Sequence, residues 1–184
     1  MVRVGVGFDM HRLVSGRPLI LGGVSVPFDR GLEGDSDADA LTHAILDALL
    51  GAAGLGDIGT HFGVGRPENM GICSLLLLER VVALVRSQGY RVNNVDATVV
   101  AEAPKIGPLI PAMRKTLAAV LGVEEARVNL KGTTAKGLGT LGAGEGIATL
   151  AVASVVRLPT SRRRSTTARD AHPRAAGKSS RRTK

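Results

Sequence analysis

Two residues near the start of the chain, Asp9 and His11, have side chains that bind metals, and one position separates them in the segment GFDMHRL. In a strand, residues two apart project from the same face, so the carboxylate and the imidazole would lie side by side. They supply two of the three protein ligands that a catalytic zinc site uses, which leaves a fourth position for a substrate. A D-x-H pair is also typical of an exposed strand end, so a metal site needs a third ligand.

His43 is the candidate third ligand, and it lies in an amphipathic segment. Asp39, His43 and Asp47 follow one another at intervals of four, which places them on one face of a helix predicted over residues 37–53. Asp47 is placed to orient the His43 imidazole as a hydrogen-bond acceptor outside the ligand set. A histidine in this setting is also typical of a hydrogen-bonded structural residue, so a site that joins residues 9, 11 and 43 is a hypothesis from spacing.

Two elements must position these side chains. The strand predicted over residues 2–11 has one continuous apolar face, and its other face carries two glycines before the candidate ligands. A glycine in a strand lets another backbone or a ligand approach closely, so we expect close packing on that face. The helix over 37–53 is expected to take Ser36 as its N-cap and to end at Gly54 or Gly56.

The rest of the chain alternates between predicted strands and helices. Apolar periodicity assigns the type of each segment, and glycine, proline and acidic clusters separate them. The predicted order is an extended segment over 17–28 broken at Gly22-Gly23, a loop over 29–37, an irregular stretch over 57–70, a helix over 74–89, a strand over 90–103, a helix over 107–122, a strand over 127–134, a glycine-rich loop over 136–146 and a buried strand over 147–158. This alternation favours a two-layer α/β or α+β sandwich.

Composition excludes several classes of protein. Of the 184 residues, 44% are hydrophobic and 2% aromatic, so the core must be aliphatic. The scarcity of aromatic side chains argues against modules that stack nucleic-acid bases. A single cysteine excludes an internal disulfide and a cysteine-rich zinc site. No segment is apolar for the length of a membrane span and no signal-peptide pattern is present, so we expect a cytoplasmic protein with no membrane partner.

The net charge of +8 belongs to the C-terminal end. Residues 157–184 hold ten Lys/Arg and one acid, whereas the remaining chain holds 14 Lys/Arg and 15 Asp/Glu. This end has few apolar side chains beyond alanine, so burial cannot offset the entropy of ordering it. We therefore expect one domain over residues 1–158 and a disordered basic tail over 159–184. Nucleic acid is expected as a partner only through weak binding by the tail, which is otherwise a solvated extension.

Five segments together resemble the 2-C-methyl-D-erythritol 2,4-cyclodiphosphate synthase family over residues 2–157: GFDMHRL, GDSDADALTHAILDALLGAAGLGDIGTHF, NVDATVVAEAPKIGPLIPAMR, VNLKGTT and GAGEGIA. The resemblance implies an α+β, ferredoxin-like two-layer α/β sandwich that forms a homotrimer with active sites between subunits. It implies a cyclising phosphorus–oxygen lyase of the non-mevalonate isoprenoid pathway. The substrate would be the cytidine diphosphate compound 4-diphosphocytidyl-2-C-methyl-D-erythritol 2-phosphate, and the products the cyclic diphosphate and CMP.

The resemblance also implies roles for individual residues. The zinc ligands are Asp9, His11 and His43, and the catalytic residue credited with transition-state stabilisation is Thr134. The substrate is implied to contact Asp9, Met10 and His11 near the metal, Asp35 and Ser36 in a phosphate-side loop, Asp57, Ile58 and Gly59 around methylerythritol, Ala101, Pro104 and Lys105 in the turn that binds cytosine, and Thr133, Thr134 and Lys136 at the nucleotide phosphates.

Two of these positions depart from the family pattern. Asp35 stands where the family usually has a histidine, and a carboxylate repels a diphosphate unless it turns away or binds a cation. Lys136 stands where the family usually has a glutamate that holds a second cation, commonly Mg²⁺, and an ammonium group cannot bind one. Either Lys136 supplies the positive charge itself, or the diphosphate is held weakly and the enzyme is impaired. The alternative function is a non-catalytic trimer that binds zinc and a cytidine nucleotide.

Overall fold

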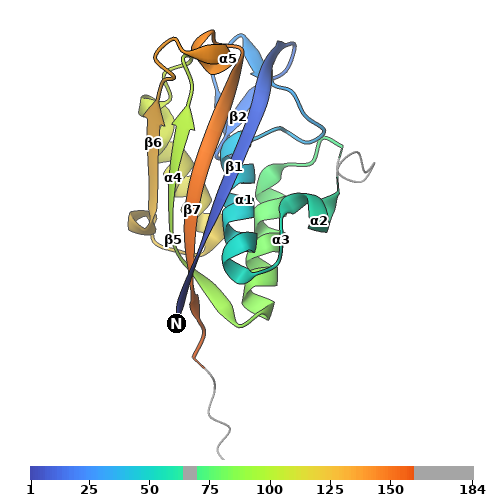
Figure 1. The fold of residues 1–184 in the computed structure, drawn as a ribbon, viewed down its shortest axis with the longest axis vertical. Coiled ribbons are helices and arrows are strands. Elements are labelled where there is room, and N and C mark those ends of the chain that lie inside the picture. Colours follow the sequence, from blue (N-terminus) through green and yellow to red (C-terminus); the bar gives the residue numbers. More distant parts are fainter. Residues whose placement is uncertain (64–69, 160–184) are drawn as a thin grey trace, which may run out of the picture.

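The computed structural model describes residues 1–63 and 70–159. Five strands form one sheet in the order β4-β1-β7-β5-β6. Figure 1 shows β1, β7, β5 and β6 side by side. Only β5 and β6 pair in parallel; the other neighbours are antiparallel. The bounds of the sheet strands are β1 Val2–Ser15, β4 Arg30–Leu32, β5 Tyr90–Val100, β6 Val128–Thr133 and β7 Gly146–Arg157. The basic tail predicted over 159–184 falls outside the described residues except for its first position.

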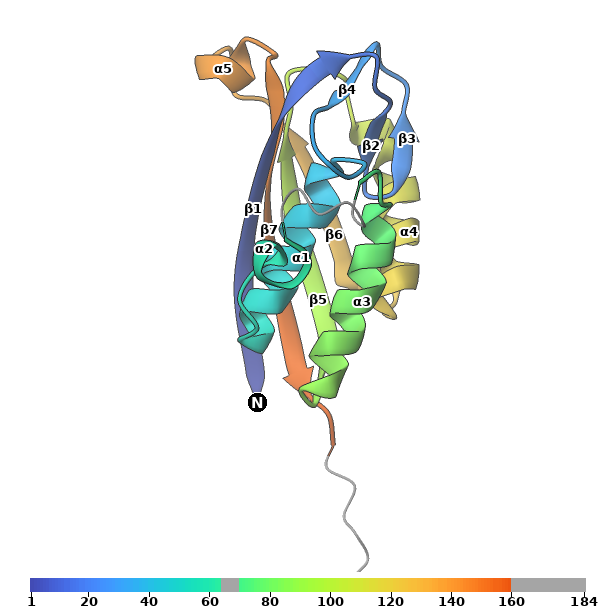
Figure 2. The same cartoon turned by 90° about the vertical axis from the view of Figure 1, so that its right-hand side faces the viewer.

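Helices cover one face of the sheet, which gives the predicted two layers (Figure 2). The long helices are α1 Ala40–Ala53, α3 Ser74–Ser87 and α4 Ile110–Leu121. The short elements are the hairpin of β2 Leu19–Leu21 and β3 Val24–Val26, the helices α2 Ile58–Phe62 and α5 Gly139–Gly142, and the 3-10 turns η2 Gly107–Leu109 and η3 Glu125–Arg127. Aliphatic side chains of both layers form one core. Among residues 1–63 and 70–159, no helix has the length and apolar character that crossing a bilayer requires.

The two faces of β1 behave differently, as the alternation predicts. On the helix side, a Cβ atom at Gly7 would lie 2.0 Å from the carbonyl oxygen of Ala44, and one at Gly5 would lie 2.1 Å from that of Ala48. The glycines therefore allow α1 to lie directly on β1, which brings His43 toward the strand. On the opposite side the apolar series is exposed; Val4, for example, is 62% exposed.

Helix α1 begins later than predicted, and Ser36 is not its N-cap. Asp39 is the N-cap, and its side chain accepts a hydrogen bond from the Thr42 N–H. The helix cannot extend further back because Ala38 has a φ of 55°, outside the right-handed helical region. The C-terminal prediction is confirmed, since Gly54 caps the helix in the left-handed conformation.

Asp39 ties α1 to the β2–β3 hairpin. Its buried carboxylate accepts hydrogen bonds from the N–H groups of Gly22 (2.9 Å) and Gly23 (2.7 Å) as well as from the N–H and hydroxyl of Thr42. Burial raises the pKa of Asp39, although these four hydrogen bonds oppose the rise. The carboxylate thereby holds the start of the helix that carries His43.

Replacing Asp39 with asparagine is expected to lower the free energy of unfolding by about 2–4 kcal/mol. The amide nitrogen cannot accept, so donors that now meet the carboxylate lose their partner in a buried site. Urea denaturation measures the change. Asp29→Asn is the matched control, because that side chain is 81% exposed; we expect a change within about 0.5 kcal/mol. Equal stability of the two variants would contradict the role given to Asp39.

Candidate metal centre

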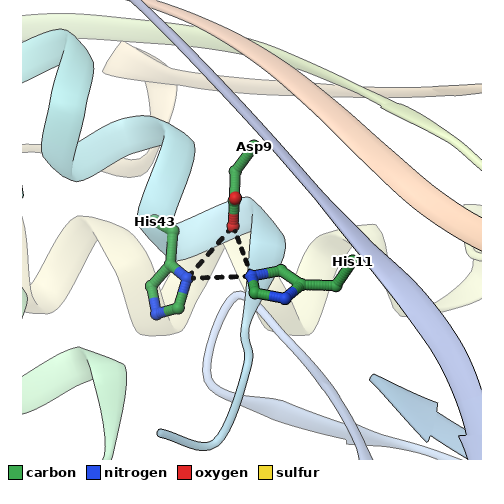
Figure 3. Close-up of side chains that lie close together, drawn as sticks. All are labelled: Asp9, His11 and His43. Atoms are coloured by element: carbon green, nitrogen blue, oxygen red, sulfur yellow. Dashed lines mark hydrogen bonds and ion pairs between the residues drawn. The ribbon is translucent and has the colours of Figure 1, made fainter. Parts of the chain in front are cut away.

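The predicted ligands meet at one point. Asp9 and His11 project from β1 and His43 projects from α1 toward them (Figure 3). Asp9 Oδ2 lies 2.9 Å from His11 Nε2 and 3.0 Å from His43 Nδ1, and the two ring nitrogens are 3.4 Å apart. All three ligand atoms lie within 4.8 Å of one another, close enough to hold one metal ion.

Electrostatics favour the ionised form of Asp9. Burial alone would raise the pKa of Asp9, but the hydrogen bonds and charges of His11 and His43 outweigh it and hold the pKa well below its usual range. Burial would lower the pKa of His11, but Asp9 and the Glu33 carbonyl outweigh that effect and raise it. Asp9 is therefore held in its ionised form, and an ionised carboxylate suits a cation.

The donor set fits a divalent metal. His11 Nδ1 lies 2.6 Å from the carbonyl oxygen of Glu33, and His43 Nε2 lies 3.2 Å from Ser36 Oγ and 2.8 Å from Ser74 Oγ. Each imidazole thus has a hydrogen-bond partner at its outer nitrogen, and the lone pair of its inner nitrogen is directed at the common centre. Two imidazoles and one carboxylate fit zinc or another divalent first-row metal and leave coordination positions open.

Asp47 does not orient His43, contrary to our prediction. Its Oδ1 accepts a hydrogen bond from the Ile58 N–H at 2.7 Å, so it holds the start of α2 instead. Burial raises the pKa of Asp47, and the Ile58 N–H opposes that rise. The residues that do reach the outer side of His43 are serines from a loop and from α3.

The centre opens into a cavity of about 370 Å³. Several residues that we predict to contact the substrate line this cavity. Asp35, Ser36, Ile58 and Gly59 line it together with the three candidate ligands. Asp57 is not among the lining residues; it caps α2 by accepting from the Thr60 N–H at 2.7 Å. The Met10 side chain is also absent from this cavity, because alternation along β1 turns it to the opposite, exposed face.

Arg17, which the sequence does not mark as a site residue, bonds a loop that lines this cavity. Its guanidinium donates to the carbonyl oxygens of Gly34 at 2.8 Å and Ser36 at 2.7 Å. These two hydrogen bonds hold the loop that carries Asp35. An arginine between a loop and a short strand has no sequence pattern that distinguishes it from a surface residue, so only the fold reveals this contact.

Five of the six remaining predicted residues line a second cavity, of about 450 Å³. Ala101, Pro104, Lys105, Thr133 and Thr134 line it at the carboxyl ends of the parallel pair β5 and β6. None of its lining residues lines the metal-side cavity. Strands β7 and β5 separate β6 from β1, a distance of about 14 Å at the usual strand spacing. One chain thus brings the predicted residues together in two groups.

Lys136 lies at the rim of the second group. It has a φ of 57°, and its N–H donates to Thr134 Oγ1 at 3.3 Å. The next N–H, of Gly137, donates to Glu102 Oε1 at 3.2 Å. The turn is therefore tied to Thr134 and to the segment after β5, and it carries the exposed Lys136.

The YgbB family model matches residues 2–156. A 2-C-methyl-D-erythritol 2,4-cyclodiphosphate synthase of Symbiobacterium thermophilum is 60% identical over 83% of this chain and 97% of its own length. One of Desulfatibacillum aliphaticivorans is 57% identical over 83% of this chain and 98% of its own length. Among solved structures, the Plasmodium falciparum IspF complex with CDP is similar with a TM-score of 0.76 and 32% identity, covering 86% of this chain and 97% of that one.

Proposed function

The chain belongs to the YgbB family, and we propose from this premise that it converts 4-diphosphocytidyl-2-C-methyl-D-erythritol 2-phosphate into 2-C-methyl-D-erythritol 2,4-cyclodiphosphate and CMP. The observation that carries the proposal is the convergence of Asp9, His11 and His43 at the mouth of a cavity, in a chain that spans nearly the full length of synthases up to 60% identical to it. The enzyme would be a cyclising phosphorus–oxygen lyase of the non-mevalonate pathway.

The reaction is an intramolecular phosphoryl transfer. An oxygen of the 2-phosphate forms a bond to the β-phosphorus, and the bond from that phosphorus to the bridging oxygen breaks, so CMP leaves with that oxygen. A phosphate monoester is largely doubly ionised at neutral pH, so the nucleophile needs no general base. The protein must fold the substrate so that the attacking and leaving oxygens are in line, and stabilise the charge.

We assign the groups that perform these tasks as follows. Asp9, His11 and His43 would hold a divalent metal, which when bound withdraws charge from a phosphoryl oxygen. Zinc suits this role because the reaction transfers no electrons. The Ser36 hydroxyl donates to the phosphate that enters the metal-side cavity. The Thr133 and Thr134 hydroxyls and the Lys136 ammonium group hold the nucleotide phosphates, and Thr134 stabilises the transition state. Backbone groups from Ala101 to Lys105 bind cytosine.

A homotrimer with ferredoxin-like subunits and active sites between them is part of the same proposal. The two groups of predicted site residues line separate cavities, so the group of one subunit needs that of a neighbour to hold a single substrate. The exposed apolar face of β1, which continues onto Leu150 and Val152 of β7, supports such an assembly, because a monomer seldom leaves a continuous apolar strip in water.

We place the protein in the cytoplasm. A chain with one cysteine cannot form an internal disulfide, so an oxidising compartment would not stabilise it. Residues 1–158 would form the synthase domain, with substrate contacts from Met10, Asp35, Asp57, Ile58 and Gly59 as well. Residues 159–184 would form a basic tail with at most weak affinity for nucleic acid.

The experiment is a direct assay of product formation. Purified zinc-loaded protein is incubated with the substrate, CMP is measured by chromatography and the cyclic diphosphate by ³¹P NMR. We expect both products in equal amounts. Absence of CMP above background, with zinc alone and with added Mg²⁺, would overturn the proposal. Binding of CDP without turnover would instead support the non-catalytic alternative, which the names of the relatives do not favour.

Replacing Lys136 with glutamate is expected to make turnover dependent on Mg²⁺. The ammonium group supplies one positive charge to the phosphates; its loss lowers kcat/KM by about tenfold or more without Mg²⁺. A carboxylate at this position can then bind Mg²⁺, which restores turnover. The control is Lys115→Glu, an equal charge change at an exposed position on α4. If Lys136→Glu and the control have equal kcat/KM values, both with and without Mg²⁺, the phosphates do not contact Lys136.

A further inference from the structure

Ser74, the first residue of α3, is fully buried beside His43, and the reaction described above does not use it. Its Oγ lies 2.8 Å from His43 Nε2, and its hydroxyl also donates to Asp37 Oδ1. We propose that Asp37 and Ser74 form a positioning relay that fixes the tautomer and the orientation of His43 for metal binding. The inference rests on the proposed metal centre, and it gives specific roles to two residues outside it.

The hydrogen bonds of the relay have one consistent direction. An ionised carboxylate only accepts, so the Ser74 hydroxyl must donate to Asp37 Oδ1. The oxygen of Ser74 then offers its lone pairs to His43, and the imidazole donates from Nε2–H. A neutral imidazole has one N–H, so Nδ1 retains its lone pair. That lone pair faces Asp9 Oδ2 and His11 Nε2 at the centre of the triad, which is the tautomer that a metal requires.

Ser36 is the other hydroxyl near His43 Nε2, and its setting differs. It lies farther away, at 3.2 Å, and it accepts a hydrogen bond from the Ala38 N–H at 3.1 Å. It also lines the metal-side cavity, which Ser74 does not. With Ser74 as the acceptor for His43, the Ser36 hydroxyl can direct its own hydrogen toward a phosphate oxygen. Ser74 therefore orients the metal ligand His43, and Ser36 contacts the substrate.

The backbone holds the relay in place. The Ser74 N–H donates to Asp37 Oδ2 at 2.9 Å, so Asp37 meets Ser74 through both oxygens. The Asp37 N–H donates to the carbonyl oxygen of Ile72 at 3.1 Å, and the Gly71 N–H donates to that of Asp35 at 2.7 Å. The segment before α3 is thus bonded to the loop before α1. This arrangement holds the Ser74 oxygen at a fixed position relative to His43. The side chains that line the metal-side cavity take no part in these hydrogen bonds.

The test measures metal affinity. Zinc affinity of Ser74→Ala and Asp37→Asn is determined by competition with a chromophoric chelator, and we expect a loss of about 10–100-fold for Ser74→Ala. Ser74→Thr keeps the hydroxyl and should bind zinc within about threefold of the unchanged protein, as one intact hydrogen bond requires. Ser87→Ala is the matched control, because Ser87 lies at the exposed end of the same helix and its hydroxyl donates to the Leu84 carbonyl oxygen, away from His43.

A spectroscopic readout separates positioning from a general effect on folding. In the zinc-loaded protein the Nε2–H proton of His43 should give an NMR signal protected from exchange, and Ser74→Ala should lose it. Thermal unfolding of the metal-free variants is measured alongside. Lower stability with unchanged zinc affinity and a persistent Nε2–H signal would overturn the relay. Wild-type zinc affinity in His43→Ala would overturn the metal centre itself, a distinct outcome. If Ser74→Ala does not fold, Asp37→Asn is judged by the same two criteria.

Discussion

Replacing His43 with alanine is expected to reduce CMP release by about a thousandfold or more and to remove the bound metal. The imidazole is one of the three candidate ligands found among the described residues, and its loss would leave Asp9 and His11 to hold the ion alone. Lewis-acid stabilisation of phosphoryl charge contributes several kcal/mol, and each 1.36 kcal/mol changes a rate by about tenfold. Steady-state CMP release, with metal content measured on the same sample, checks the prediction.

The matched control for this prediction is His61→Ala. His61 lies on α2, and its Nε2 bonds the carbonyl oxygen of Leu55 at 2.7 Å, outside the triad. We expect this variant to keep its metal and to lose less than about tenfold in rate, as a substitution away from the reacting atoms should. If His43→Ala still contains stoichiometric metal and releases CMP like the control, the three side chains do not form the catalytic metal centre.

The sequence predicted correctly that Asp9 and His11 lie side by side, for a simple reason. Side-chain alternation in a strand follows directly from the backbone, so Asp9 and His11 had to share one face. The glycine face of the same strand indicated the close approach that the structure confirms at Gly5 and Gly7. The joining of His43 to this pair came from the resemblance to a family; spacing within the helix did not establish it.

Tertiary contacts explain where the predictions were wrong. Ser36 looked like the N-cap, but Ala38 adopts a left-handed conformation that nothing in its type indicates, and Asp39 takes the cap. Asp47 shares a helix face with His43, yet its carboxylate bonds Ile58. The nearer of the two hydroxyls at the outer nitrogen of His43 is that of Ser74, 31 residues away in the chain. Periodicity relates residues within one element, and it carries no information about which loop meets that element.

The two departures from the family pattern have different surroundings. Lys136 extends from a turn that is bonded to Thr134, which supports a direct contact with the nucleotide phosphates. Asp35 lines the metal-side cavity, and Gly71 bonds its carbonyl oxygen. A negative side chain beside the candidate cation centre can add to cation binding, whereas the same charge next to a diphosphate would weaken it. The two departures therefore belong to different groups of the predicted site residues.

Replacing Gly7 with alanine is expected to lower the free energy of unfolding by more than about 4 kcal/mol, or to prevent folding. The added Cβ would lie 2.0 Å from the Ala44 carbonyl oxygen and 2.7 Å from the Ala48 nitrogen, which are backbone atoms of α1 that cannot move aside singly. Helix α1 must then shift from β1 as a unit, and it carries His43 away from Asp9. Urea denaturation measures the stability, and zinc affinity is measured on any folded fraction.

Gly51 provides the matched control for this substitution, because it lies at the same strand–helix contact but on the helix. A Cβ there would meet its nearest atoms, Gly5 Cα and Val6 O, at 4.0 Å, which is ordinary contact. Alanine is favoured over glycine within a helix, so Gly51→Ala should be neutral or stabilising by up to about 1 kcal/mol. If Gly7→Ala is as stable as Gly51→Ala and binds zinc equally well, close contact between β1 and α1 does not position the metal ligands, and the centre must be held together mainly by the hydrogen bonds of its own side chains.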